Sequence, residues 1–226
     1  MICHWCYNEG VKKIISFDLD GTLVNARFGD MVWNHGIPLE YSIKHNIPFD
    51  EAKSLIRKQY ESVGDADLLW YEIDRWLEKF DLSVTSEELL ERYESQIEPV
   101  PYAQEVLEYL GQKYILVIAS NAARIFVDKE LDYTDFRRYF SRIISATSDC
   151  KMVKKENRFY QWLCETMQVP PDEIIHIGDH PVFDHDIPSR VGIEAYYLMS
   201  GQLDDNSSDL DGRRTIKSLK ELLERL

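Results

Sequence analysis

Five short apolar runs constrain the fold of this 226-residue chain more than any other feature of its sequence. Each run holds four to seven residues with few polar interruptions, and the five cover residues 13–18, 114–120, 142–146, 174–177 and 195–199. Runs of this length are typical of buried parallel strands that helices cover on both faces. We therefore predict a sheet whose strands are separated by helical segments.

Helical patterns fill the intervals between the later runs. Apolar residues recur at helical spacing in three segments, which are 103–110, 159–167 and 216–226. Gly111 caps the first segment, Pro170 stops the second, and Leu219, Leu222 and Leu223 face inward in the third. Strands that alternate with helices in this way predict an α/β fold with a doubly wound, Rossmann-like parallel sheet.

The long segment between the first two runs departs from this alternation. Residues 27–100 contain no convincing strand, although a crossover between parallel strands needs only about a dozen residues. We therefore predict an inserted all-helical cap domain at 24–100. The α/β core would then comprise residues 1–23 and 101–226, with hinges near Val24–Asn25 and at 98–101.

Several patterns predict helices within the cap. Ala52, Leu55 and Ile56 share one helical face, and Thr85 opens a capping box with Glu88. A longer stripe consists of Leu69, Ile73, Trp76, Leu77 and Phe80. We expect the aromatic residues Trp70, Tyr71 and Trp76 to lie in the core of the cap, with contact to a ligand as the alternative.

Charge and apolar content exclude some classes of partner. Forty Asp and Glu residues against 26 Lys and Arg residues give a formal net charge of −14. Nucleic-acid binding depends on basic side chains that displace counterions from phosphates, so it is not expected. No apolar run approaches the roughly 20 residues of a membrane span. We expect a cytoplasmic monomer or homodimer that binds neither nucleic acid nor membrane.

The four cysteines point to no disulfide framework. Cys3 and Cys6 have the spacing of half a zinc site, but zinc needs four ligands and no second pair follows. We expect reduced thiols in an N-terminal extension, with a metal site shared between subunits as the alternative.

The segment Phe17-Asp18-Leu19-Asp20-Gly21-Thr22-Leu23 directly follows the first predicted strand. Ligands of open α/β sheets bind in the crevice outside the carboxyl ends of the strands. Asp18 and Asp20 can both reach such a site if the strand unwinds there, and Gly21 lets the chain turn sharply. Two close carboxylates repel each other, so we expect a cation or a shared proton beside them.

This segment resembles the first motif, DxDGT, of the haloacid dehalogenase-like hydrolase superfamily. Three further segments match that superfamily's motifs in the correct order: Ile118-Ala119-Ser120-Asn121, Lys154 ahead of Phe159-Tyr160, and Gly178-Asp179-His180-Pro181-Val182-Phe183-Asp184. The match spans 13–226 except for the cap, where only the helical character agrees. The lysine motif departs from the usual Lys-Pro, because this chain has Lys154-Lys155.

The resemblance implies a phosphatase that works through a covalent intermediate. Asp18 would attack the substrate phosphorus to form an aspartyl-phosphate, and Asp20 would act as general acid and then general base. Ser120 and Asn121 would bind the phosphoryl oxygens. Lys154 would neutralise charge there, with Lys155 as the alternative.

The resemblance also implies a Mg²⁺ site. Asp18, Asp179 and Asp184 would hold the ion together with the backbone carbonyl of Asp20. Nearby histidines, namely His176, His180 and His185, suggest a transition-metal site as the alternative, but the matched positions supply only oxygen ligands, which favours Mg²⁺.

The reaction class follows from the second acid of the first motif. Dehalogenases of this superfamily lack that acid, so Asp20 favours phosphoryl transfer over carbon–halogen cleavage. A phosphomutase and a non-catalytic binding protein are further alternatives. The predicted function is hydrolysis of a small phosphorylated metabolite, with Arg27, Trp33 and His35 as candidate cap contacts.

Overall fold

The computed structural model describes residues 14–153, 156–199 and 214–226, and it contains a six-stranded parallel sheet in the order β3-β2-β1-β4-β5-β6. The strands are β1 (Ile14–Phe17), β2 (Ile115–Ser120), β3 (Arg142–Ser145), β4 (Ile174–Gly178), β5 (Glu194–Leu198) and β6 (Thr215–Ile216). The five predicted strands are confirmed, with small shifts at their ends. The short edge strand β6 was not predicted.

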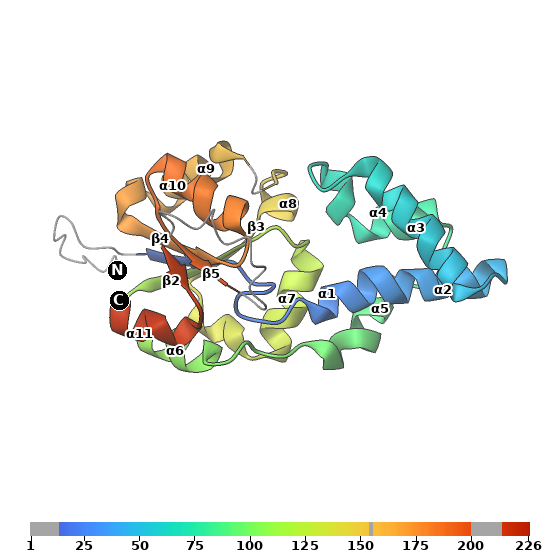
Figure 1. The fold of residues 1–226 in the computed structure, drawn as a ribbon, viewed down its shortest axis with the longest axis horizontal. Helices are drawn as coiled ribbons and strands as arrows, with labels where there is room; N and C mark the ends of the chain where they lie inside the picture. Colours follow the sequence, from blue (N-terminus) through green and yellow to red (C-terminus); the bar gives the residue numbers. More distant parts are fainter. Residues whose placement is uncertain (1–13, 154–155, 200–213) are drawn as a thin grey trace, which may run out of the picture.

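Helices cover both faces of the sheet, as Figure 1 shows. The helices of this layer are α6 (Ala103–Leu110), α7 (Arg124–Tyr133), α8 (Ala146–Asp149), α9 (Asn157–Met167), α10 (Ile187–Val191) and α11 (Leu222–Arg225). Alternate residues of β1 enter different apolar clusters: Ile14 packs with residues of α9 and α10, and Ile15 with residues of α6 and α11. This alternation confirms the doubly wound, Rossmann-like core.

The predicted helix at 216–226 is wrong in its extent. Ile216 pairs with Leu198 in the sheet, and the Ser218 side chain then accepts a hydrogen bond from the Lys220 N–H. A 3₁₀ turn follows at Leu219–Glu221 before α11 begins. Leu219 and Leu222 are buried as expected, and Leu223 is only partly buried.

The segment between β1 and β2 is helical, as predicted. It contains α1 (Arg27–Met31), a π-helix (Val32–Gly36), α2 (Ile37–His45), α3 (Phe49–Val63), a 3₁₀ helix (Leu68–Tyr71), α4 (Ile73–Lys79), α5 (Ser86–Tyr93) and a 3₁₀ turn (Glu94–Gln96). Thr85 forms the predicted capping box of α5.

Two details of the cap were predicted wrongly. The stripe from Leu69 to Phe80 is not one helix, because the chain leaves the 3₁₀ helix at Glu72 before α4 begins. Leu55 is 41% exposed and does not share the buried face of Ala52 and Ile56.

The two linkers between the sheet and the helical segment run side by side. The Asn25 N–H donates to the Glu98 carbonyl at 2.9 Å, and the Val100 N–H donates to the Leu23 carbonyl at 2.9 Å. One cluster of buried side chains continues from the sheet into the helical segment. The domain boundaries at 23/24 and 100/101, and the hinge there, stay predictions.

No helix among the described residues is both long and apolar enough to span a bilayer.

Candidate active site

The sheet order reverses between β1 and β4, and this reversal places the candidate site. The Asp18 N–H extends the pairing of these strands by donating to the Ile177 carbonyl at 2.8 Å. Asp179 comes directly after β4. Because an open α/β sheet binds its ligands outside the strand ends at such a reversal, both acids lie where a ligand is expected.

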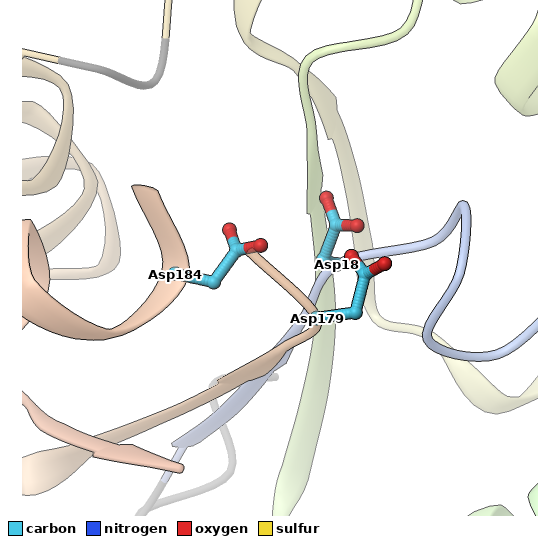
Figure 2. A group of neighbouring side chains, drawn as sticks. All are labelled: Asp18, Asp179 and Asp184. Carbon is cyan, nitrogen blue, oxygen red and sulfur yellow. The ribbon is translucent and has the colours of Figure 1, made fainter. Parts of the chain in front are cut away.

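Three of the predicted carboxylates meet at this point. Asp18, Asp179 and Asp184 each offer an oxygen atom, and these atoms lie within 4.8 Å of one another. Figure 2 shows the Asp184 side chain reaching toward the other two from the π-helix Pro181–Asp186 that follows β4. Asp18 is 7% exposed and Asp184 is 2% exposed, so little water screens their repulsion.

The backbone around these acids leaves them the space that they need. A Cβ atom on Gly21 would overlap the carboxylate of Asp179, and φ at Gly21 is +75°, a value that favours glycine. A Cβ atom on Gly178 would overlap the side chain of Asp184. A divalent cation with oxygen ligands, such as Mg²⁺, fits this set of donors.

Hydrogen bonds fix the orientation of Asp184. Its Oδ2 accepts the His180 N–H at 3.1 Å, and its Oδ1 lies 3.2 Å from Nε2 of His176. The ring of His180 instead accepts the N–H groups of Val182 and Phe183 and stacks on the Phe183 ring. Across the described residues, the three acids are the one group with metal-binding spacing, so the alternative histidine site is not formed there.

Asp20 lies in the cavity beside this group, and its carboxylate is not part of the group. Its proposed contribution to a metal is the backbone carbonyl alone, which stays a prediction. The side chain of Asp20 instead neighbours Glu130 of α7, a residue that is 0% exposed. No donor among the described residues reaches either oxygen of Glu130.

These surroundings favour the neutral acid form of Glu130. Burial, and then the negative charges of Asp20 and Asp18, raise the pKa of its carboxyl well above the usual range. In this form its O–H would be a donor toward Asp20, and the site would gain no further negative charge. The sequence carried a signal that we did not use: Glu130 falls on the apolar face of α7 with Phe126, Val127 and Leu131.

Ser120 ends β2 at the edge of the same cavity and is buried. Its Oγ accepts the Ala122 N–H at 3.0 Å, which leaves its own O–H available to donate to a ligand. Asn121 also lines the cavity. Two residues at the end of β3 and the start of α8 hold this loop from behind: Ser145 donates to the Ala122 carbonyl at 2.7 Å, and Thr147 donates to the Asn121 carbonyl at 2.8 Å.

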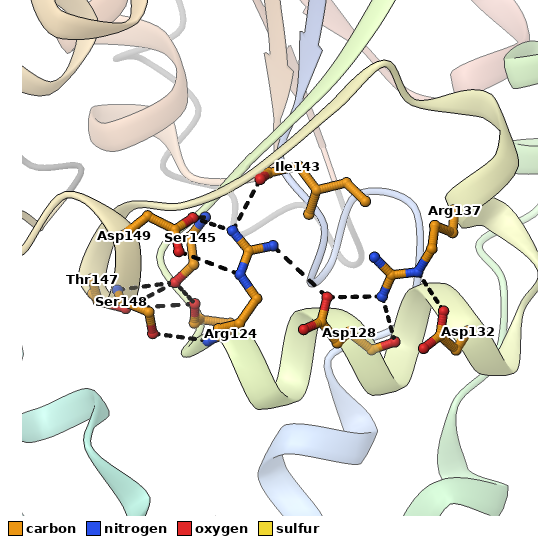
Figure 3. A network of polar contacts seen from close by, with 10 residues as sticks. Arg124, Asp128, Asp132, Arg137, Ile143, Ser145, Thr147, Ser148 and Asp149 are labelled. Carbon is orange, nitrogen blue, oxygen red and sulfur yellow. Dashed lines mark hydrogen bonds and ion pairs between the residues drawn. The ribbon is translucent and has the colours of Figure 1, made fainter.

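An ion network, drawn in Figure 3, links the start of α7 to the segment at the end of β3. The Arg124 side chain binds Asp149 and donates to the Ile143 carbonyl at 2.9 Å. The Arg124–Asp149 pair joins α7 to the segment that carries Ser145 and Thr147, and Asp128 lies between Arg124 and Arg137. The network thus lies next to the loop that carries Ser120 and Asn121.

The predicted site lysine, Lys154, lies outside the described residues, as do its alternative Lys155 and the pair Cys3 and Cys6. Lys151 is described. It lies at a second cavity of about 510 Å³ and not at the acids.

A cavity of about 860 Å³ opens between the strand ends and the helical segment. The acids, Ser120 and Asn121 lie on its sheet side. On the cap side, Trp33 and His35 line it as predicted, whereas Arg27 is exposed to solvent and does not. Trp70 and Tyr71 also line the cavity and are only partly buried, in contrast to the fully buried Trp76.

One face of α3 contributes cavity residues that sequence reasoning missed. They lie at helical spacing and are Lys53, Ile56, Arg57, Tyr60 and Glu61. Arg57 pairs with Glu61 at 2.8 Å, while Lys53 forms no ion pair with an acid in the described part of the chain. The spacing was visible in the sequence, but the direction of this face depends on tertiary packing.

Comparisons with known proteins agree with the site. Residues 12–186 match the family model of haloacid dehalogenase-like hydrolases. GMP/IMP nucleotidase YrfG of Escherichia coli K12 is 24% identical over 167 residues, which are 73% of this chain and 73% of that protein. The crystal structure of a HAD phosphatase from Thermococcus onnurineus superposes with a TM-score of 0.80 at 26% identity, over 94% of this chain and 97% of that one. A 2-haloacid dehalogenase from Pseudomonas syringae shares the fold, with a TM-score of 0.66 at 18% identity over 94% and 96% of the two chains.

Replacement of Gly178 by Ala tests the space around Asp184. The added methyl group must displace the Asp184 side chain, so we expect Mg²⁺ affinity, measured by calorimetric titration, to fall about 10-fold or more. Gly64→Ala is the control, because no atom lies within 4 Å of the added Cβ, and its φ of +80° adds a backbone strain that Gly178→Ala lacks. Equal Mg²⁺ affinity in Gly178→Ala and wild type would show that Asp184 does not need this space.

Replacement of Glu130 by Gln tests its neutral state. Because its pKa is raised in the folded protein, the native state holds a proton that the unfolded chain releases, and stability falls as pH rises through that interval. Gln does not titrate, so it removes this loss of stability with pH, and its side-chain amide keeps a donor toward Asp20. Urea unfolding at several pH values without metal should show the free energy of unfolding of Glu130→Gln rising relative to that of wild type, by up to about 1.4 kcal/mol per pH unit, as the pH rises above the usual glutamate pKa of about 4.3. Parallel pH curves for the two proteins would contradict the assignment.

Proposed function

The chain belongs to the haloacid dehalogenase-like hydrolase family, and from this premise we propose that it is a Mg²⁺-dependent phosphatase acting through an aspartyl-phosphate on Asp18. The observation that carries the proposal is the meeting of Asp18, Asp179 and Asp184 at the strand ends, beside Asp20 and Ser120. The phosphatase from Thermococcus onnurineus, with its similar fold, supports the same reaction class.

The first half of the reaction transfers the phosphoryl group to the protein. An oxygen of Asp18 attacks the phosphorus, and the bond between phosphorus and the ester oxygen breaks. Asp20 donates a proton to the departing oxygen, so that an alcohol leaves and not an alkoxide. Ser120 donates its O–H to a phosphoryl oxygen, and Lys154, or Lys155 as the alternative, places positive charge beside it.

The second half releases phosphate. Asp20, now a carboxylate, takes a proton from a water molecule that attacks the phosphorus. The bond between phosphorus and the Asp18 oxygen breaks, and Asp18 returns as a carboxylate. When bound, Mg²⁺ would offset the repulsion between the substrate's oxygens and the carboxylates of Asp18, Asp179 and Asp184. The presence of Asp20 supports this reaction over the carbon–halogen cleavage that we considered as an alternative.

The cavity supports a nucleoside monophosphate as the substrate. Its volume of about 860 Å³ lies within the usual range for small-molecule sites. Trp33, Tyr60 and Trp70 form an aromatic wall: the ring centroids of Trp33 and Tyr60 are 5.8 Å apart, and those of Tyr60 and Trp70 are 6.0 Å apart. A nucleobase would stack on such rings. Lys53 lines the same cavity and would offer a donor to the polar edge of the base. The E. coli relative is named a GMP/IMP nucleotidase, so these two nucleotides are the first to test.

Release of inorganic phosphate from p-nitrophenyl phosphate tests the reaction. We expect turnover with Mg²⁺ and none after removal of metal with EDTA. Asp18→Asn should lower kcat about 1000-fold or more, because it removes the nucleophile. Asp172→Asn, at an exposed acid outside the cavity, is the control and should match wild type. Wild-type turnover in Asp18→Asn would overturn the assigned nucleophile.

A second comparison tests the substrate class. GMP and IMP should be hydrolysed with higher kcat/KM than ribose 5-phosphate, which lacks the base. Trp70→Leu should lower kcat/KM for the nucleotides by about 5- to 150-fold, the usual worth of one stacking contact, and leave ribose 5-phosphate unaffected. Tyr109→Leu, at an exposed aromatic residue of α6, is the control. Equal losses for both substrates in Trp70→Leu would refute the stacking role.

A further inference from the structure

His176 is the one residue of β4 with a polar side chain, and it is 0% exposed. Its register partner on β1 is Ser16, which is buried as well. The neighbouring positions on this side of the sheet, such as Ile14 and Val117, are apolar and pack against α9. A buried imidazole among such neighbours costs free energy unless its nitrogen atoms are hydrogen-bonded. The partners of this ring therefore indicate why it is there.

The two ring nitrogens of His176 connect β1 to the group of acids. Nδ1 lies 3.1 Å from Oγ of Ser16, and Nε2 lies 3.2 Å from Oδ1 of Asp184. Nε2 also lies 3.2 Å from the hydroxyl oxygen of Tyr160. That hydroxyl donates to the Phe183 carbonyl at 2.6 Å, next to Asp184 in the chain.

These partners decide which nitrogen carries the proton. The Asp184 carboxylate accepts hydrogen bonds and does not donate them, and the Tyr160 O–H is already used by the Phe183 carbonyl. Nε2 of His176 must therefore be the donor. In the neutral ring Nδ1 then accepts the O–H of Ser16. A donor is thus aimed at Asp184 from inside the sheet.

Asp184 needs such a donor because of its surroundings. It lies within 4.8 Å of the oxygen atoms of Asp18 and Asp179, so repulsion favours rotation of its side chain away from them. The N–H of His180, which follows β4, donates to one oxygen of Asp184. The ring of His176, on β4 itself, contacts the other oxygen. Two donors on two oxygens fix the plane of the carboxylate.

We propose that His176 is a positioning residue, which holds the Asp184 carboxylate in the orientation that lets the three acids bind one Mg²⁺ ion. This inference rests on the metal site of the proposed function. It adds a role for a residue that touches neither substrate nor metal. Carboxylates and imidazoles that orient a metal ligand in this way are typically worth 10- to 100-fold in metal affinity.

The test is calorimetric titration of Mg²⁺ into metal-free wild type and variants. His176→Leu removes the donor, and we expect its Mg²⁺ dissociation constant to rise about 10- to 100-fold. His176→Gln keeps an N–H in reach of Asp184 and should stay within about 3-fold of wild type. Ser16→Ala removes one member of the same buried set of hydrogen bonds but leaves the His176 donor in place. Its Mg²⁺ dissociation constant should therefore also stay within about 3-fold of wild type. At saturating Mg²⁺, His176→Leu should regain most of its kcat.

The outcomes separate this inference from the function on which it rests. Wild type that binds no Mg²⁺ would refute the metal site itself. If wild type binds Mg²⁺ and His176→Leu binds it equally well, the positioning role alone is refuted. The same holds if Ser16→Ala loses as much Mg²⁺ affinity as His176→Leu. Should His176→Leu fail to fold, ¹⁵N NMR of the wild-type histidine rings still decides: we expect the proton on Nε2 of His176, and a proton on Nδ1 alone would overturn the proposal.

Discussion

Mutual repulsion of three carboxylates is the constraint on which the rest of the structure depends. Asp18, Asp179 and Asp184 bring oxygen atoms within 4.8 Å of one another in a place with little water. Such a group persists only if the chain is held around it and a cation offsets its charge. The surrounding features serve this requirement: two glycines that leave room, an N–H and an imidazole that fix Asp184, and a buried Glu130 kept neutral beside Asp20.

The order of the strands explains how these groups meet. β1 lies between β2 and β4, so the residues that follow all three strands share one edge of the sheet. Asp18, Ser120 and Asp179 arrive there from separate parts of the sequence. The helical segment inserted after β1 then closes the other side of the cavity with an aromatic wall. The sheet supplies the groups for chemistry, and the insertion supplies those that would recognise the organic part of a substrate.

Much of this was predictable from the sequence, and the failures have physical causes. Apolar runs located five strands because buried strands are nearly continuous in apolar residues, whereas the two-residue β6 is too short to leave such a run. The match to the superfamily's motifs singled out Asp18, Asp179 and Asp184, and the structure brings them together because strand ends in a parallel sheet lie at one edge. Arg27 was assigned to the cavity by closeness in sequence, which does not fix the direction of a side chain on a helix.

Other features needed the three-dimensional structure. The roles of Tyr60 and Trp70 depend on how α3 and the 3₁₀ helix pack over the sheet, which periodicity cannot supply. Glu130 was detectable as an acid on an apolar helical face, but its neighbour Asp20 is 110 residues away in the chain. His176 entered the sequence analysis only as one histidine of the alternative metal site, and its distances to Ser16 and Asp184 indicate a different role.

The central claim is that these separate strand ends form one cation site. Crystals soaked in Mn²⁺, an ion that scatters anomalously and prefers the same oxygen ligands, test it directly. The account predicts one strong anomalous peak in contact with the carboxylates of Asp18, Asp179 and Asp184. A peak elsewhere on the protein, with none at these carboxylates under saturating Mn²⁺, would contradict the account.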